Sequence, residues 1–321
     1  MTIRLRSAWR PLLGFAILLI VAAGVSPAAI GDRLAVADLR LAIIALLGLV
    51  AVHALPAAGW WAILGTTTGV WLPRRSAMSL FYAAQAIGGI TPANLGGDIH
   101  RAATLRGAGH GWSVAVVPLI VQRATSYLAL SGLSLAALVI VAASTPVAGG
   151  LVAVGTACAG VIAAAAWMLL APPKPLRGAY ARLAGWVGGG SRPTSVAVPR
   201  LGAATLIGIG SGLLFHAASI GLAWVLVVAV DPGIPAAPVL GSLAVARLSL
   251  AVPFVPSGLG VQEGALALLF ASLGLSADSA LAAMLLARIA LVLTTALGVV
   301  LLMRPAAAAP LGPNGTYSPT S

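Results

Sequence analysis

The amino-acid sequence predicts an all-α protein with several membrane-spanning helices, and two observations carry this prediction. Hydrophobic residues make up 60% of the 321 residues and charged residues only 7%, whereas a soluble domain carries about 25% charged residues. Mean hydropathy is +1.06, and apolar runs of the roughly 20 residues that a helix needs to cross a bilayer recur along the sequence. Among the 321 residues, these apolar runs leave no stretch long enough for a soluble catalytic domain.

Six apolar runs are long enough to cross the membrane in full. The first follows basic residues and precedes small residues near Ala28, as a cleaved signal peptide would, but the repeat described below needs this run as a helix. We expect the crossings at about residues 11–30, 40–65, 113–143, 147–172, 201–230 and 278–303.

Two further apolar stretches, at about 76–110 and 235–275, are interrupted by "GGITPANLGGD" and "PFVPSGLGVQE". Proline and glycine break a helix, and freed backbone groups at membrane depth are tolerated only inside protein or beside a watery cavity. We therefore expect two re-entrant or broken-helix hairpins. The expected break residues are Pro92, Asn94, Gly96, Gly97, Pro256, Gly258 and Gly260.

Basic residues between the runs set the expected orientation, because short cytoplasmic loops carry an excess of Lys and Arg. If the N-terminus is inside and both hairpins return to the side from which they came, only Arg33 and Arg40 fall outside. Heavy use of Ala, Gly and Arg indicates a GC-rich bacterial source, so we expect a bacterial inner-membrane protein with both termini cytoplasmic and a disordered tail at 305–321. Thirteen basic residues then lie inside: Arg4, Arg6, Arg10, Arg74, Arg75, Arg101, Arg106, Lys174, Arg177, Arg182, Arg192, Arg200 and Arg304.

An internal repeat relates the two interrupted stretches. Residues 92–96 and 256–260 share the pattern P-x-x-L-G at a separation of 164 residues. An acidic residue follows each pattern, and an arginine lies 25 residues after each acid: Asp98 with Arg123, and Glu263 with Arg288.

The repeat divides the chain into two membrane units, residues 1–145 and 146–304. Each unit would hold three crossings and one hairpin. Because three is an odd number, the second unit is expected to be inverted relative to the first. In transporters of this design, interrupted helices from the two halves meet near the membrane midplane and form the substrate site.

Charged residues at membrane depth cost about 3 kcal/mol or more unless they have a partner or water. Two readings account for those here: structural ion pairs, Asp98 with Arg123 and Glu263 with Arg288, or contacts with a ligand. Arg247 has no counterpart in the first unit, so the set carries excess positive charge. The arginine fork fits a phosphate, which favours an anionic ligand. Peptide N–H groups expected to be uncovered at the glycine breaks favour an anion as well.

Several other functions are not supported. The basic residues fall in short groups, without the continuous stripe that nucleic-acid binding uses. Cys158 is the only cysteine, which excludes a disulfide within these residues and a thiolate metal cluster; its apolar neighbours predict a buried, inert thiol. His53 and His216 are isolated on apolar helices and are expected to be core histidines. No HExxH, Walker or G-x-S-x-G motif occurs, so we expect no catalytic residues, metal or cofactor.

The stretches "GGITPANLGGDIHRAATLRGAG", "QRATSYLALSGL", "PFVPSGLGVQEGALALLF" and "LLARIALV" resemble the membrane domain of lysylphosphatidylglycerol synthases and its stand-alone flippase-like relatives, over about residues 10–303. Gln122 departs from the pattern, since such proteins often carry an acid there. The sequence contains no cytosolic aminoacyl-transfer domain, so the resemblance implies lipid movement between leaflets and not lysine transfer. It identifies as motif positions Asp98, Arg101, Arg123, Gly260, Glu263 and Arg288.

We therefore expect a flippase-like transporter that moves an anionic lipid, either a phospholipid or a polyprenyl-phosphate-linked lipid. Two alternatives remain open: an ion-coupled carrier of a small water-soluble anion, and a non-transporting partner of a lipid-modifying or glycosylating enzyme. The expected binding partners are anionic membrane lipids. The candidate substrate-binding residues are Asp98, Arg101, Arg123, Arg247, Glu263 and Arg288.

Overall fold

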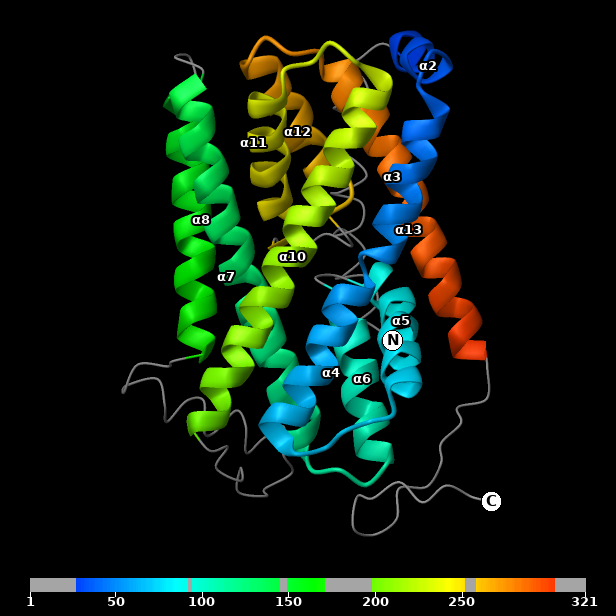
Figure 1. Cartoon of the computed structure of the whole chain (residues 1–321), viewed down its shortest axis with the longest axis vertical. Helices are drawn as coiled ribbons and strands as arrows, with labels where there is room; N and C mark the ends of the chain where they lie inside the picture. The colour runs from blue at the N-terminus through cyan, green and yellow to red at the C-terminus, as the bar shows by residue number, and fades with distance from the viewer. Residues whose placement is uncertain (1–26, 92–93, 145–148, 171–197, 252–257, 304–321) are drawn as a thin grey trace, which may run out of the picture.

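The computed structural model describes residues 27–91, 94–144, 149–170, 198–251 and 258–303. Every regular element within these ranges is a helix, so the predicted all-α class is confirmed. The helices form one elongated bundle (Figure 1).

Four helical stretches are long and apolar enough to cross a membrane: Leu39–Thr68, Trp112–Ala143, Gly202–Val230 and Ala277–Met303. The first consists of α3 (Leu39–Ala51) and α4 (Ala54–Thr68). The others belong to α7 (Trp112–Ser144), α10 (Val198–Val230) and α13 (Ala277–Met303). They correspond to four of the six predicted crossings.

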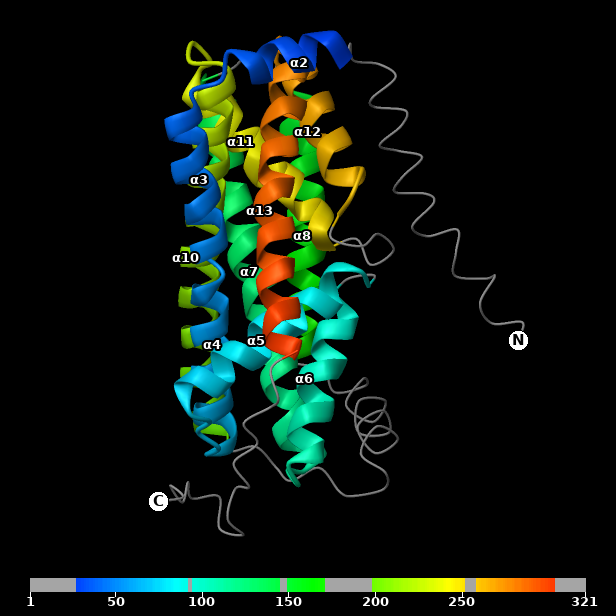
Figure 2. The ribbon, with the colours of Figure 1, turned by 90° about the vertical axis from the view of Figure 1, so that its right-hand side faces the viewer.

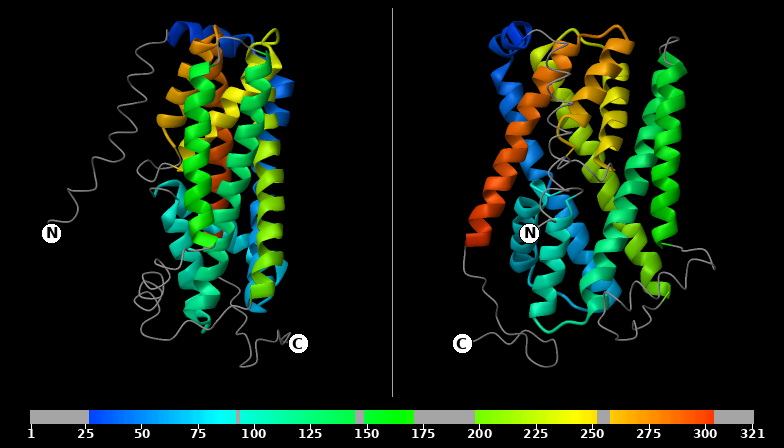
Figure 3. Two further views of the ribbon diagram at one scale, coloured as in Figure 1. Left: turned by 90° about the vertical axis from the view of Figure 1, so that its left-hand side faces the viewer. Right: turned by 180° about the vertical axis from the view of Figure 1, so that it is seen from behind.

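The other two predicted crossings have different outcomes. The run at about 147–172 forms α8 (Gly149–Leu170), in which the apolar stretch Val152–Met168 is shorter than the four above. It pairs with α7 along one side of the bundle (Figure 3). Most of the run at about 11–30 lies outside the described residues. Its last four residues belong to α2 (Pro27–Ala35), which lies across the end of the bundle (Figure 2).

Both predicted interruptions are present as pairs of short helices. The first pair is α5 (Arg74–Gly89) and α6 (Leu95–Gly107). The second is α11 (Ala236–Arg247), which continues into a 3-10 turn at Leu248–Ala251, and α12 (Val261–Ser272). In each hairpin the chain runs towards the middle of the bundle and then back (Figure 1).

The two hairpins occupy opposite halves of the bundle. The first lies in the half where α4 ends, and the second lies in the half where α10 ends (Figure 1). Helix α13 packs against both hairpins, through α12 and α5. Gly298 lets α13 approach α5 closely, because a Cβ there would collide with the carbonyl oxygen of Tyr82. The inner ends of both helix pairs therefore lie towards the middle of the bundle (Figure 1).

Candidate functional site

The first hairpin is fastened to the bundle through Asp98, in the first turn of α6. One carboxylate oxygen accepts from Arg101 Nη2 at 2.5 Å, and the other accepts from Arg123 Nε on α7. The first turn of a helix favours a negative charge because its N–H groups carry partial positive charge. The predicted Asp98–Arg123 ion pair is thus present, and one aspartate serves two arginines.

Arg101 is enclosed by protein, with 6% of its surface exposed. Its guanidinium carbon lies 5.1 Å from the Trp60 ring and 5.0 Å from the Phe81 ring, a cation–π arrangement. Its Nη1 donates to Gln122 Oε1 at 2.9 Å, while Gln122 Nε2 donates to the Pro56 carbonyl at 2.7 Å. Arg101 thus ties α6 to α4, α5 and α7. An acid at position 122 could not donate to Pro56 in its ionised form.

The second hairpin is fastened in a related way. Glu263 is 3% exposed. Its Oε2 accepts from the Gly260 backbone N–H at 2.8 Å and its Oε1 accepts from Arg288 Nε at 2.5 Å. Gly260 has φ +79°, which favours glycine because it has no Cβ. The predicted Glu263–Arg288 pair is present and joins α12 to α13.

Two backbone N–H groups at the breaks are already bonded within the chain, which corrects one expectation. The Gly96 N–H was expected to be uncovered, but it donates to Thr91 Oγ1 at 2.9 Å. The Gly260 N–H is taken by Glu263. Asn94 has φ 58° and its Nδ2 donates to Gln85 Oε1 at 3.1 Å. Because a side-chain oxygen of the chain already accepts from each, the N–H groups of Gly96 and Gly260 cannot serve an anion. Pro92 and Pro256 lie outside the described residues.

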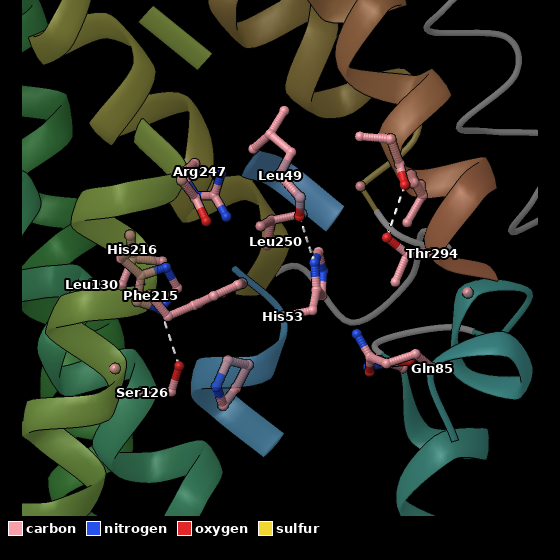
Figure 4. Close-up of a pocket in the computed structure, with 18 of the residues that line it drawn as sticks. Leu49, His53, Gln85, Ser126, Leu130, Phe215, His216, Arg247, Leu250 and Thr294 are labelled. Atoms are coloured by element: carbon pink, nitrogen blue, oxygen red, sulfur yellow. Dashed lines mark hydrogen bonds between the residues drawn. The ribbon is translucent and has the colours of Figure 1, made fainter. Parts of the chain in front are cut away.

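A cavity of about 350 Å³ lies between the hairpins and the long helices (Figure 4). Asn94 and Gly258 from the breaks line it, whereas Gly96, Gly97 and Gly260 do not. Glu263 does not line the cavity either, but it contacts Arg288, which does. Five of the six candidate substrate-binding residues do: Asp98, Arg101, Arg123, Arg247 and Arg288.

Arg247 differs from the other arginines of the cavity. It ends α11, where the partial negative charge of the helix C-terminus favours a cation. Its guanidinium carbon lies 5.7 Å from the Phe215 ring, and its buried Nε has no hydrogen-bond partner. No ion pair joins it to any residue that the structure describes. Among the described residues, the cavity lining and Glu263 beside it thus hold four arginines and two acids, Asp98 and Glu263.

Two histidines that sequence analysis assigned to the core also line the cavity (Figure 4). His53 Nδ1 lies 2.8 Å from the Leu49 carbonyl, which can only accept. His216, 4% exposed, has Nε2 at 3.0 Å from Ser126 Oγ, whereas its Nδ1 is buried without a partner. The Phe215 ring lies between them, with centroids 5.6 Å from His53 and 5.0 Å from His216. Nothing in their sequence neighbourhoods signals this convergence, because His53 lies in the turn between α3 and α4, far in sequence from Phe215 and His216 on α10.

Cys158 is exposed on α8, which corrects the expectation of a buried thiol. Helix α8 packs mainly on α7, so its opposite face stays uncovered and apolar neighbours in sequence do not imply burial. Among the described residues, no group of three His, Cys, Asp or Glu side chains could hold a metal ion.

Residues 7–298 match the family model described as "Lysylphosphatidylglycerol synthase TM region". No curated protein matches the chain.

Proposed function

The chain belongs to the lysylphosphatidylglycerol synthase transmembrane-region family, a family of membrane proteins related to lipid handling, and from this premise we propose that it moves an anionic lipid between leaflets. The lipid is a phospholipid or a polyprenyl-phosphate-linked lipid. Its headgroup passes through the cavity between the hairpins, and its acyl or prenyl chains stay in the bilayer.

The observation that carries this proposal is the excess of positive charge around the cavity. Four arginines and two acids leave a formal charge of +2. Uncompensated charge is costly in a membrane protein and marks a ligand path. A volume of about 350 Å³ suits a headgroup or a small anion, since ligand sites commonly span about 300–1,000 Å³.

The hairpins supply a route for alternating access. We propose that both are re-entrant and that residues 1–145 and 146–304 are inverted repeats. Two features support this: the hairpins lie in opposite halves of the bundle (Figure 1), and each is fastened by an acid to an arginine 25 residues later. In such a design, rocking of one unit against the other opens the central site to each side in turn.

The orientation follows from the basic residues. Arg74, Arg75 and Arg106 lie at the end of the bundle that holds the first hairpin, and Arg33 and Arg40 lie at the other end (Figure 1). We propose that the first end is cytoplasmic, that the membrane is the bacterial inner membrane and that both termini are cytoplasmic.

The test is translocation in vesicles. Purified protein is reconstituted into vesicles that contain tail-labelled phosphatidylglycerol, and a membrane-impermeant quencher reports the label that reaches the outer leaflet. We expect movement faster than in protein-free vesicles, and faster than for tail-labelled phosphatidylcholine, whose choline cancels the negative charge. Rates equal to protein-free vesicles would contradict the proposal. Uptake of radiolabelled phosphate without lipid movement would favour the small-anion carrier instead.

A further inference from the structure

Two buried nitrogen atoms of the cavity lining have no hydrogen-bond partner and belong to side chains that form no ion pair with a described residue. They are Arg247 Nε, at the end of α11, and His216 Nδ1, on α10. A buried donor without a partner loses about 1–3 kcal/mol relative to its state in water. Two such groups facing one cavity therefore indicate a place for a ligand that accepts hydrogen bonds.

Phe215 holds the two groups in one place. Its ring lies 5.7 Å from the guanidinium carbon of Arg247 and 5.0 Å from the centre of the His216 ring. Figure 4 shows Arg247 above Phe215 and His216, all at the same side of the cavity. The aromatic face attracts the guanidinium while leaving its N–H edges free to bind.

The hydrogen bond from Ser126, on α7, determines whether His216 Nδ1 is a hydrogen-bond donor. The Ser126 hydroxyl lies 3.0 Å from His216 Nε2. When the hydroxyl donates to Nε2, the imidazole proton resides on Nδ1, which then points a donor into the cavity. The partner at one ring nitrogen thus sets the role of the other.

The motif arginines are engaged differently. Arg123 donates to Asp98, and Arg288 donates to Glu263. Arg101 donates to Asp98 and Gln122. Each of these three guanidiniums already has an acceptor on protein, whereas Arg247 has no ion pair with a described residue.

We infer that Arg247 and His216 form a phosphate-binding subsite, distinct from the two motif ion pairs that fasten the hairpins. Arg247 supplies charge and N–H donors, and His216 supplies the Nδ1–H donor. The ligand is a phosphate group, and the inference rests on the proposed function in assigning that phosphate to a lipid headgroup. Phosphate oxygens are strong acceptors and suit the arginine fork.

Binding is measured by calorimetry on the purified full chain in a neutral detergent. The probes are short-chain phosphatidylglycerol, inorganic phosphate and short-chain diacylglycerol, which lacks the phosphate. We expect the first two to bind and the third not to bind. Arg247→Gln and His216→Phe should each weaken binding of both phosphate-bearing probes about tenfold or more, as loss of a charge-assisted hydrogen bond implies.

Two matched variants serve as controls. His216→Asn places an amide N–H near the position of Nδ1–H and should retain affinity closer to that of the parent than His216→Phe does. Arg40→Gln removes an exposed arginine at the far end of the bundle and should leave affinity unchanged. If Arg247→Gln and His216→Phe are folded and bind both probes like the parent, the subsite is wrong.

A second measurement uses the unmodified parent, so it does not depend on folding of the variants. Phenylglyoxal labels accessible arginines, and mass spectrometry reports the extent at Arg247. Phosphatidylglycerol should protect Arg247 and diacylglycerol should not; equal labelling with both would overturn the assignment. Failure of the subsite and failure of the proposed function are distinguishable. If the variants bind phosphate more weakly but the parent does not translocate lipid, the subsite holds and the flippase proposal is wrong. If the parent translocates lipid and the variants translocate it equally well, the flippase proposal holds and the subsite is wrong.

Discussion

Gly97, on α6, lies directly against the carbonyl oxygen of Ala84, on α5, so that a Cβ at position 97 would overlap that oxygen. The obstacle is backbone, which cannot swing aside as a side chain can. The contact sets how closely the two arms of the first hairpin approach, and therefore where Asp98, the next residue, presents its carboxylate to Arg123.

The first prediction concerns this contact. Gly97→Ala should lower stability by about 1–3 kcal/mol, because a methyl group forced into a packed contact displaces backbone. Thermal unfolding in detergent measures the loss. Gly107→Ala is the matched control on the same helix, since a Cβ there meets nothing within 4 Å. Equal melting temperatures for Gly97→Ala and the parent would mean that the hairpin tolerates a wider spacing.

The second prediction concerns the pair that fastens the second hairpin. Glu263→Gln keeps an oxygen that can accept from the Gly260 N–H but leaves the Arg288 charge without its carboxylate, which should cost about 3–5 kcal/mol. The double variant Glu263→Gln/Arg288→Gln should regain much of this stability because no unpaired charge is left. A double-mutant cycle from thermal unfolding measures the coupling. If the stability losses of the two single variants simply add in the double variant, Glu263 and Arg288 do not stabilise the second hairpin as a pair.

The third prediction concerns Arg101. Arg101→Lys keeps the charge but cannot reach Asp98 and Gln122 with separate nitrogens while it lies between Trp60 and Phe81. We expect a loss of about 1.5–3 kcal/mol in unfolding free energy, as for a hydrogen bond to a charged group. Arg75→Lys, at an exposed position of the same hairpin, should have little effect. A melting temperature for Arg101→Lys as high as that of Arg75→Lys would be inconsistent with this role.

The fourth prediction concerns orientation. In a Cys158→Ser background, Arg75→Cys and Gly107→Cys should both react with an impermeant thiol reagent from the cytoplasmic side only, because the two ends of the first hairpin lie at the same end of the bundle (Figure 1). Arg40→Cys should react from the outside. The assay uses right-side-out and inverted vesicles. Labelling of positions 75 and 107 from opposite sides would remove the re-entrant hairpin.

The features of the fold and of the candidate site that could be predicted are those that depend on residues close together in the sequence. Apolar runs and the two Pro- and Gly-rich interruptions are local properties. They predicted six crossings, of which four are long apolar helices in the structure, and both breaks. Of the two readings left open for the charged residues at membrane depth, the one with Asp98–Arg123 and Glu263–Arg288 ion pairs is confirmed, because an acid so costly at that depth needs a cation nearby. The crossing count, the repeat and the substrate remain predictions.

The sequence by itself therefore determined that the chain is an all-α membrane protein with two helix breaks and a matched acid and arginine for each. Only the tertiary structure decided what surrounds each arginine. Arg101 lies against Trp60 and Phe81 and donates to Gln122, whereas Arg247 lies against the ring of Phe215 and forms no ion pair with a described residue. Ser126 reaches His216 across 90 residues of sequence. Such contacts depend on how each helix is rotated about its axis against its neighbours, and that rotation is set by packing across the whole bundle.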